Sequence, residues 1–307
     1  MIIFLRRKLL GAGSLRGMTA FIEGNNITTK AMGKSAIFFE GERCAIVRND
    51  KLVQHEDLIK SSDLLVRWGC TTGTGVPLDK QVNPSDAIHQ VGDKAGFRKH
   101  CMENDPDIVP FSVFNDTPIP DNIGKMVLRP PVHSQGKKLW LTDGPTELKH
   151  AVIQNGLQGG WYASEFIDKA AEFRVYVGSG RVITVAEKTP ENPNAVAWNV
   201  AQGGRFDVVK WGDWNFNVLN CAIRAYNLTK LDFAGVDIMV DKNGRAYLIE
   251  INSAPSLPLL SDNSVSYRQE CMGKYFLHLL ENGKDRLELG DTNNWRGYIH
   301  PAIWSKK

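Results

Sequence analysis

The sequence predicts a mixed α/β (α+β) protein in which a small N-terminal α/β unit precedes a larger region built on antiparallel strands. In the first ninety or so residues, short apolar runs are separated by polar turns, which is typical of short strands and helices. Farther along, apolar runs follow one another closely. Two of them meet across Asp241–Gly244 (DKNG), a sequence that favours a tight hairpin turn.

The N-terminal unit is predicted to span residues 1–92. Its expected strands are Ile2–Leu5, Ser35–Glu40, Arg43–Val47 and Asp63–Trp68, and its expected short helices are Gly17–Glu23 and His55–Ser61. The segment Gly69–Pro77 (GCTTGTGVP) is rich in glycine and threonine and therefore predicts a loop. A new element is expected to start after Asn83, with Ser85 or Asp86 as its helix cap.

The larger region is predicted to span residues 93–285, and residues 286–307, which show no clear period, are expected to form a C-terminal tail. Helices are expected at Asp93–Glu103, Thr146–Gln154, Trp214–Tyr226 and Tyr267–Leu280. Strands are expected at Val109–Phe114, Lys125–Leu128, Leu139–Leu141, Trp161–Ile167, Glu172–Val177, Arg181–Glu187, Gly235–Val240 and Arg245–Ile251.

Length and composition limit the function classes. The 307 residues are enough for about two domains, and 37 basic against 34 acidic side chains give no case for a nucleic-acid partner. No run of 18 apolar residues occurs, so we expect no membrane span and no membrane partner. The five cysteines lie far apart and include no CxxC pair, which favours free thiols in a reducing cytoplasm over a disulfide framework or a zinc site.

Several common catalytic motifs are incomplete. Gly33-Lys34-Ser35 lacks the earlier glycine of a phosphate-binding P-loop, because Thr28 stands there. Gly11 and Gly13 lack the third glycine of a dinucleotide fingerprint, whose place Arg16 takes. No GxSxG elbow occurs, and the seven histidines show no metal-ligand spacing.

The most informative segment is the hairpin within Leu231–Pro258. Glu250 and Asn252 are two residues apart on a strand, so their side chains leave the same face. A turn centred between Lys242 and Asn243 would put Asp237 opposite Leu248, on that same face and one diagonal step, about 7–8 Å at Cα, from Glu250. A bulge at Gly244 would shift the register and move Asp237 to the wrong face.

Two carboxylates and an amide oxygen would then converge, as in a site for magnesium. The alternative is an ordinary hairpin with a polar face in solvent. Both strands are otherwise apolar, so the sheet is expected to be buried on at least one face, and carboxylates at the edge of such a core need a partner. These flanking apolar residues are Val236, Ile238, Val240, Leu248, Ile249 and Ile251.

The stretch GVDIMVDKNGRAYLIEINSAPSLP resembles the C-terminal metal-binding segment of the ATP-grasp superfamily, and its texture is most similar to that of ribosomal-protein glutamate ligases. Ser256 replaces the glycine that commonly follows the proline. The resemblance runs from about Asn83 to Pro258. It implies an ATP-grasp fold, in which two antiparallel-sheet subdomains clasp ATP, with a lid subdomain at about residues 125–165.

The resemblance also implies a set of nucleotide ligands. Lys94, opening a helix after Gly92-Asp93, corresponds to a phosphate-contacting lysine, and Arg129 stands where the family commonly has lysine. Gln135 and Gly136 would belong to the loop over the triphosphate. The remaining implied ligands are Glu165, Phe166 and Ile167 at the adenine, Glu172 at the ribose hydroxyls and Lys188 near the γ-phosphate.

Three residues are implied to be catalytic. Arg174 would face the reaction centre and Lys188 would act near the γ-phosphate, while Asn199 starts a segment that resembles an Asn-x-x-x-Gly-Gly loop of the family. Gln202 stands where the relatives often carry arginine. The implied metal ligands are Asp237, Glu250 and Asn252, which would hold Mg²⁺ (or Mn²⁺) across the β- and γ-phosphates.

The implied function is an ATP-dependent carboxylate–amine ligase, which forms an amide or peptide bond through an acylphosphate. Its substrates would be a carboxylate and an amine from the amino-acid, peptide or protein class, and the sequence does not identify them. Two alternatives stay open. One is a non-catalytic ATP-binding or scaffold protein on the same fold, suggested by Arg129 and Gln202. The other is a kinase of a small hydroxylated molecule.

Overall fold

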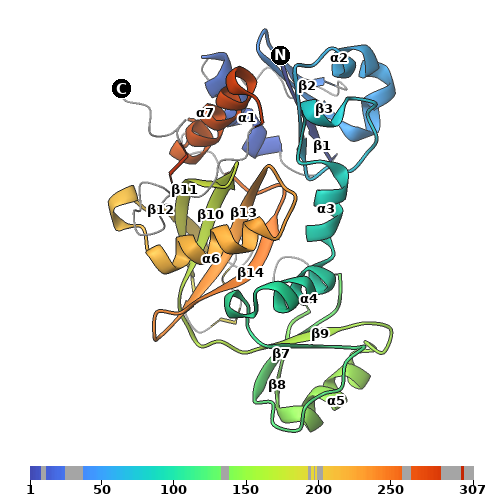
Figure 1. Cartoon of the computed structure of the whole chain (residues 1–307), viewed down its shortest axis with the longest axis vertical. Helices are drawn as coiled ribbons and strands as arrows, with labels where there is room; N and C mark the ends of the chain where they lie inside the picture. The colour runs from blue at the N-terminus through green and yellow to red at the C-terminus, as the bar shows by residue number, and fades with distance from the viewer. Residues whose placement is uncertain are drawn as a thin grey trace.

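The structure is a computed structural model, and it describes residues 1–7, 12–24, 37–132, 138–192, 195–196, 198, 203–257, 264–284 and 299–300. Three β-sheets make up its framework. Figure 1 shows the N-terminal sheet at one end of the long axis and a four-stranded sheet at the other, with a five-stranded antiparallel sheet between them. The predicted fold class of two antiparallel sheets preceded by a small α/β unit is confirmed.

The N-terminal sheet is mostly parallel, with the order β2-β3-β1-β4-β5. Its strands are β1 (Ile2–Arg6), β2 (Ile37–Glu40), β3 (Cys44–Arg48), β4 (Leu64–Trp68) and β5 (Gln81–Val82). The central strand β1 is buried along its whole length, as expected for a parallel strand covered on both faces. Its helical elements are α1 (Ala12–Glu23), η2 (Asn49–His55), α2 (Glu56–Lys60) and η3 (Leu78–Lys80).

Two helices and a short turn connect this sheet to the rest of the chain. They are α3 (Ser85–Gly92), α4 (Lys94–Asn104) and η4 (Pro106–Ile108). The predicted cap of α3 is wrong, because the helix starts directly after Pro84 and the Ser85 hydroxyl donates to the carbonyl of Thr71 instead. A side-chain cap does form one helix later, where Asp93 accepts from the backbone N–H of Gly96.

The four-stranded sheet has the order β6-β9-β7-β8 and is antiparallel. Its strands are β6 (Ser112–Phe114), β7 (Lys125–Arg129), β8 (Trp140–Asp143) and β9 (Tyr162–Glu165). Helix α5 (Gly144–Gln154) packs on one face through Leu148, against Met126 and Leu128 of β7. Because side chains alternate along a strand, Val127 and Arg129 leave the opposite face.

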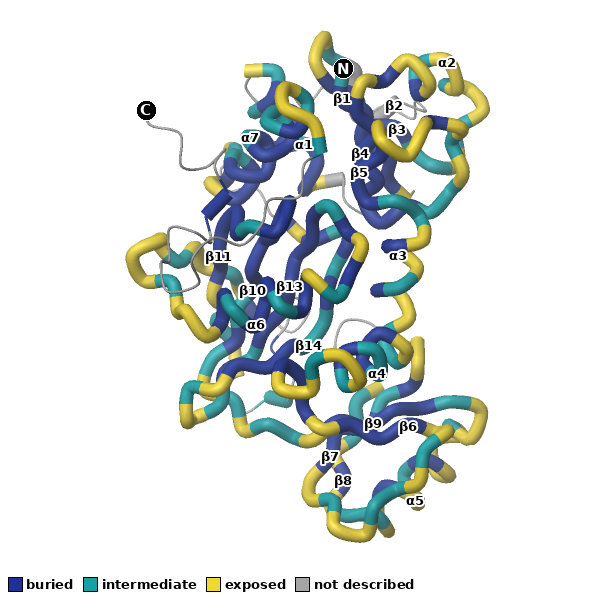
Figure 2. Tube along the Cα trace, viewed as in Figure 1, coloured by how far each residue is buried: buried dark blue, intermediate teal, exposed yellow. Residues whose placement is uncertain are grey.

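The five-stranded sheet has the order β12-β11-β10-β13-β14 and is antiparallel throughout. Its strands are β10 (Lys169–Gly178), β11 (Arg181–Thr189), β12 (Arg205–Val208), β13 (Phe233–Asp241) and β14 (Ala246–Asn252). The short helix η6 (Trp211–Asp213) leads into α6 (Phe216–Asn227), which covers one face. The central strands β10 and β13 are buried over most of their length (Figure 2).

A helix covers only part of the second face of this sheet. Helix α7 (Tyr267–Asn282) also packs against α1 and covers one end, where Tyr275 and Phe276 contact Tyr176 of β10 and Phe233 of β13. Among the described residues, no helix covers the remainder of this face, which carries charged side chains. The sheet thus has one apolar face, and a second face that is apolar under α7 and charged elsewhere.

Two predictions from composition can be compared with the described residues. All five cysteines are free thiols and are buried. Burial raises the pKa of Cys101 and Cys221 to about 12, so these thiols stay protonated. In the part of the chain that the structure describes, no helix is both long and apolar enough to span a bilayer.

Asn83 joins the N-terminal unit to the middle sheet. Its buried side chain donates to the carbonyl of Phe233 at 2.9 Å, and its Oδ1 accepts from the N–H groups of Asp232 and Phe233 at 2.8 and 3.0 Å. Its backbone adopts the left-handed conformation, with φ of 59°. Asparagine tolerates this conformation better than other side chains do, since its amide can hydrogen-bond locally.

We therefore expect Asn83→Ala to lower the free energy of unfolding by about 3 kcal/mol, because it leaves buried main-chain groups unpaired and forces alanine into a left-handed conformation. Chemical denaturation measures this. Asn83→Gly removes the hydrogen bonds without the backbone strain and should fall between the wild type and alanine. Asn104→Ala removes an exposed amide that bonds within its own helix and serves as the control. Equal stability of Asn83→Ala and Asn104→Ala would contradict the assignment.

Candidate active site

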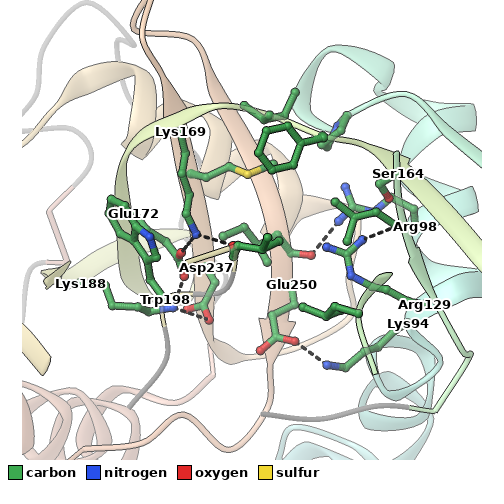
Figure 3. Close-up of a pocket in the computed structure, with 18 of the residues that line it drawn as sticks. Lys94, Arg98, Arg129, Ser164, Lys169, Glu172, Lys188, Trp198, Asp237 and Glu250 are labelled. Carbon is green, nitrogen blue, oxygen red and sulfur yellow. Dashed lines mark hydrogen bonds and ion pairs between the residues drawn. The ribbon is translucent and has the colours of Figure 1, made fainter. Parts of the chain in front are cut away.

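A cavity of 540 Å³ lies between the four-stranded and the five-stranded sheets. The four-stranded sheet, helix α4 and the charged face of the five-stranded sheet supply its walls (Figure 3). Among the described residues that line it, six side chains are cationic and four are anionic. The cationic ones are Lys94, Arg98, Arg129, Lys169, Arg174 and Lys188, and the anionic ones are Glu165, Glu172, Asp237 and Glu250. This surplus of positive charge favours an anionic ligand.

The charged wall follows from strand pairing. Arg174 of β10 lies directly opposite Asp237 of β13, which lies directly opposite Glu250 of β14. Residues that face each other across antiparallel strands project from the same face, so these three side chains form one row. Glu172, two residues before Arg174, belongs to the neighbouring row, together with Lys188 of β11.

Ion pairs link the two rows. Arg174 holds Asp237 through two parallel hydrogen bonds of 2.6 and 2.7 Å, from Nε and Nη2. Lys188 donates to Glu172, and its Nζ lies 4.0 Å from Oδ2 of Asp237. Lys169 donates to the other oxygen of Glu172 at 2.7 Å. The carboxylates are buried and each has a cationic partner, which offsets the cost of removing charge from water.

Glu250 is the acceptor of a second group of polar contacts in the cavity. It accepts from Nζ of Lys94 at 2.5 Å and from Nδ2 of Asn252 at 3.0 Å. Burial alone would raise the pKa of Glu250, but the ion pair with Lys94 and the bond from Asn252 outweigh it and lower the pKa to about 2. Burial also opposes the charge of Arg174, yet the ion pair with Asp237 raises the pKa of that guanidinium above its ordinary value.

The hairpin differs from its predicted register in two places. The turn holds three residues rather than two, with Gly244 at φ of 82°, so Ile238 rather than Asp237 lies opposite Leu248. A bulge then inserts Ile249 into β14, and Asp237 pairs directly with Glu250 rather than diagonally. The turn alone would have put Asp237 and Glu250 on different faces, and the bulge restores their common face.

The wall formed by the four-stranded sheet holds another group of predicted residues. Arg129 lines the cavity at the end of β7, with its guanidinium 5.8 Å from the ring centre of Tyr162. Glu165, Phe166 and Ile167 line it where β9 leads into the connection toward β10. The backbone N–H of Glu165 donates to Phe111 and that of Phe166 to Lys125, so hydrogen bonds fix the start of this connection.

Most of the predicted site residues therefore share one cavity. Those that line it are Lys94, Arg129, Glu165, Phe166, Ile167, Glu172, Arg174, Lys188, Asp237 and Glu250. Asn252 reaches the site through its bond to Glu250. Gln135, Gly136 and Asn199 lie outside the described residues, as does Gln202.

Sequence reasoning missed two cations of the cavity. Lys169 stands three residues before Glu172 and lies with its Nζ 4.6 Å from the ring centre of Trp198. Arg98 follows Lys94 by four residues, which puts both on one face of α4. The four-residue spacing from Lys94 could have predicted that Arg98 faces the same site. Lys169 is the first residue of β10, so its direction could not be predicted without knowing where that strand begins.

The donor set suits a hard divalent cation such as Mg²⁺. Asp237 and Glu250 offer carboxylate oxygens from adjacent strands, and Asn252 carries an amide oxygen on the same face. Within the described ranges, no group of three or more histidine, cysteine, aspartate or glutamate side chains forms a metal cage. A site with so few protein ligands leaves positions for phosphate oxygens, as magnesium sites commonly do.

The chain is similar to known proteins in sequence and in fold. The family model of the RimK-like ATP-grasp domain matches residues 122–266. No curated protein matches the sequence significantly. The structure resembles D-alanine–D-alanine ligase from Bacillus anthracis, with 13% identity, a TM-score of 0.57, and coverage of 91% of this chain and 98% of the other.

Two further solved structures share the fold. The RiPP-associated ATP-grasp ligase of Chryseobacterium gregarium, solved with ADP and a leader and core peptide, gives a TM-score of 0.60 at 11% identity and covers 94% of this chain and 99% of the other. The L-amino acid ligase from Bacillus licheniformis gives 0.54 at 14% identity, over 98% of this chain and 77% of the other. This chain thus has the ATP-grasp fold, and its residues 122–266 match the RimK-like ATP-grasp domain.

Proposed function

We propose that this protein is an ATP-dependent carboxylate–amine ligase, which joins its substrates through an amide or peptide bond and requires Mg²⁺. The observation that carries the proposal is the row Arg174–Asp237–Glu250, which places two carboxylates beside a cavity with surplus positive charge. A triphosphate with a divalent cation needs both features, since its oxygens require cations and its metal requires carboxylates.

The cavity offers different surroundings to the two ends of a nucleotide. Apolar side chains from both sheets line it, and they would enclose a flat base: Val127, Leu139, Ile167, Met239 and Ile249. Glu165 and Phe166 also line the cavity and would stand next to the base. Glu172 would accept hydrogen bonds from ribose hydroxyls, for which it would exchange one of its two lysine partners.

The phosphate end is supported by charge. Lys94, Arg129 and Lys188 line the cavity around the two metal-binding carboxylates and would neutralise phosphate oxygens. Asp237, Glu250 and Asn252 would hold Mg²⁺, which supplies charge stabilisation across the β- and γ-phosphates. Binding of the cation would release Glu250 from Lys94 and leave that ammonium free to contact phosphate.

The reaction itself needs positioning and charge rather than a protein nucleophile. A substrate carboxylate oxygen attacks the γ-phosphorus, the bond to the β-phosphate oxygen breaks, and an acylphosphate and ADP form. An amine then attacks the acyl carbon, the carbon–oxygen bond to phosphate breaks, and the nitrogen loses its proton. Arg174, fixed by Asp237, lies beside the row of metal ligands and would stabilise the charge that develops on the transferred phosphoryl group.

The neighbours support a ligase over the two alternatives, a scaffold protein and a small-molecule kinase. The three solved structures named above are all ligases, one in complex with peptides. We accordingly propose an amino acid or a peptide as the carboxylate and amine substrates, with ATP and Mg²⁺ as the nucleotide and metal.

Nucleotide binding should be measurable by thermal unfolding. A ligand that binds only the native state stabilises it by about 2.7 kcal/mol at a hundred times its Kd, which raises the Tm by roughly 5 °C for a chain of this size. ATP with Mg²⁺ should give this shift, and ATP with a chelator a smaller one. No shift with any nucleotide at millimolar concentration would argue against the site.

Glu250→Ala should reduce ATP turnover by more than about a hundredfold while the protein stays folded, because the metal loses a ligand and Lys94 loses its partner. Steady-state ADP release with a candidate substrate measures the loss, and circular dichroism checks the fold. Glu103→Ala, on an exposed position of α4, is the matched control and should keep wild-type turnover. Wild-type turnover in Glu250→Ala would show that the metal lies elsewhere.

The reaction class can be tested with an isotope. Pools of amino acids and peptides are screened for ADP release, and active carboxylates are then labelled with ¹⁸O. A ligase that works through an acylphosphate transfers one labelled oxygen to the released phosphate and yields a product that has lost one water. A phosphorylated substrate without amide would identify a kinase, and the absence of ADP release with every pool would favour a scaffold.

A further inference from the structure

Arg98 binds two consecutive main-chain carbonyls of β14. Its Nη1 donates to the oxygen of Leu248 at 2.9 Å and its Nη2 to the oxygen of Ile249 at 2.7 Å. In a regular strand, successive carbonyls point toward opposite edges, so one guanidinium does not reach both. Here it does, because Ile249 is the extra residue of the bulge. Arg98 thus recognises the bulged form of the strand.

The bulge decides where Glu250 points. Leu248 pairs with Ile238 and Glu250 pairs with Asp237, so Ile249 has no partner on β13. If β14 continued from the turn without the bulge, Ile249 would lie opposite Asp237, and Glu250 would turn toward the apolar face under α6. Both Ile249 and Glu250 instead line the cavity.

The Arg98 side chain is buried and does not simply extend into solvent. Its residue is 7% exposed, it lines the cavity, and burial lowers its pKa from the ordinary value. Among the described strands, β14 is the edge of the sheet, so carbonyls on its outer side bond to none of these strands. Without Arg98, two main-chain oxygens next to Glu250 would lose these partners, which is costly in a buried place.

We propose that Arg98 is a positioning residue for the metal site, which clamps the β14 bulge and so keeps Glu250 opposite Asp237. The inference rests on the proposed function, because it takes Glu250 as a ligand of Mg²⁺. Lys94 and Arg98 lie one turn apart on α4, so this helix supplies both the cationic partner of Glu250 and the clamp on the backbone that carries it.

The test compares Arg98→Met and Arg98→Lys with the wild type in two measurements. Amide hydrogen exchange of the segment Ala246–Asn252, without ligand, reports on the bulge itself. The Mg²⁺ concentration that half-saturates the ATP-dependent thermal shift reports on the metal site. Arg224→Met is the matched control, because the Arg224 guanidinium forms its hydrogen bonds with Asp105, directly after α4, instead of with carbonyls of β14.

We expect Arg98→Met to speed exchange in Ala246–Asn252 and to raise the half-saturating Mg²⁺ concentration at least tenfold, as loss of a residue that orients a metal ligand commonly does. Arg98→Lys keeps the charge but lacks the fork that reaches two carbonyls, so its effect should be intermediate. Arg224→Met should lower the Tm without changing either measurement.

The outcomes separate the two proposals. Unchanged exchange in Arg98→Met would overturn the clamp, and faster exchange with an unchanged Mg²⁺ requirement would overturn its role in the metal site. Equal effects of Arg98→Met and Arg224→Met would reduce Arg98 to a general packing residue and also overturn the proposal. If the wild type itself showed no response to Mg²⁺ and nucleotide, the proposed function would fail, and the metal role of Arg98 with it, whatever the exchange data show.

Discussion

Charge compensation on one face of the middle sheet is the constraint on which the rest of the site depends. Asp237 and Glu172 are buried, and a buried carboxylate is stable only with cations or hydrogen-bond donors close by. Arg174 and Lys188 meet this need from the next strands, at positions that the antiparallel register places on the same face. The pairing that makes the sheet stable is also the pairing that gathers the reactive groups.

The sequence carried enough information for the fold and for most of the cavity wall. Alternation along β10 and β14 is a local property, so the common face of Glu172 and Arg174, or of Glu250 and Asn252, can be read from spacing alone. The register between strands is not local. It depended on the three-residue turn at Gly244 and on the bulge at Ile249, two one-residue shifts in the same direction that together restore the common face and that no single-strand pattern displays.

Interactions across long sequence separations account for what the sequence did not reveal. Arg98 contacts carbonyls 150 and 151 residues away, and main-chain acceptors leave no side-chain signature in a sequence. Asn83 likewise looks like a simple turn residue before a proline, yet it joins two sheets through atoms of Asp232 and Phe233. Residue identity predicts chemistry well where side chains meet side chains, and poorly where a side chain meets the backbone.

The ion pair between Lys94 and Glu250 has a consequence for how the site takes up its ligands. The ammonium occupies one oxygen of the carboxylate that we propose as a metal ligand, so a divalent cation that binds this oxygen would displace it. Displacement is unfavourable for the metal alone, because a partly buried ammonium would lose its partner. It becomes favourable when triphosphate arrives at the same time and gives Lys94 a new anionic partner. If Glu250 binds the metal as proposed, metal and nucleotide binding would therefore be coupled, each making the other easier, because Lys94 would exchange its carboxylate partner for a phosphate.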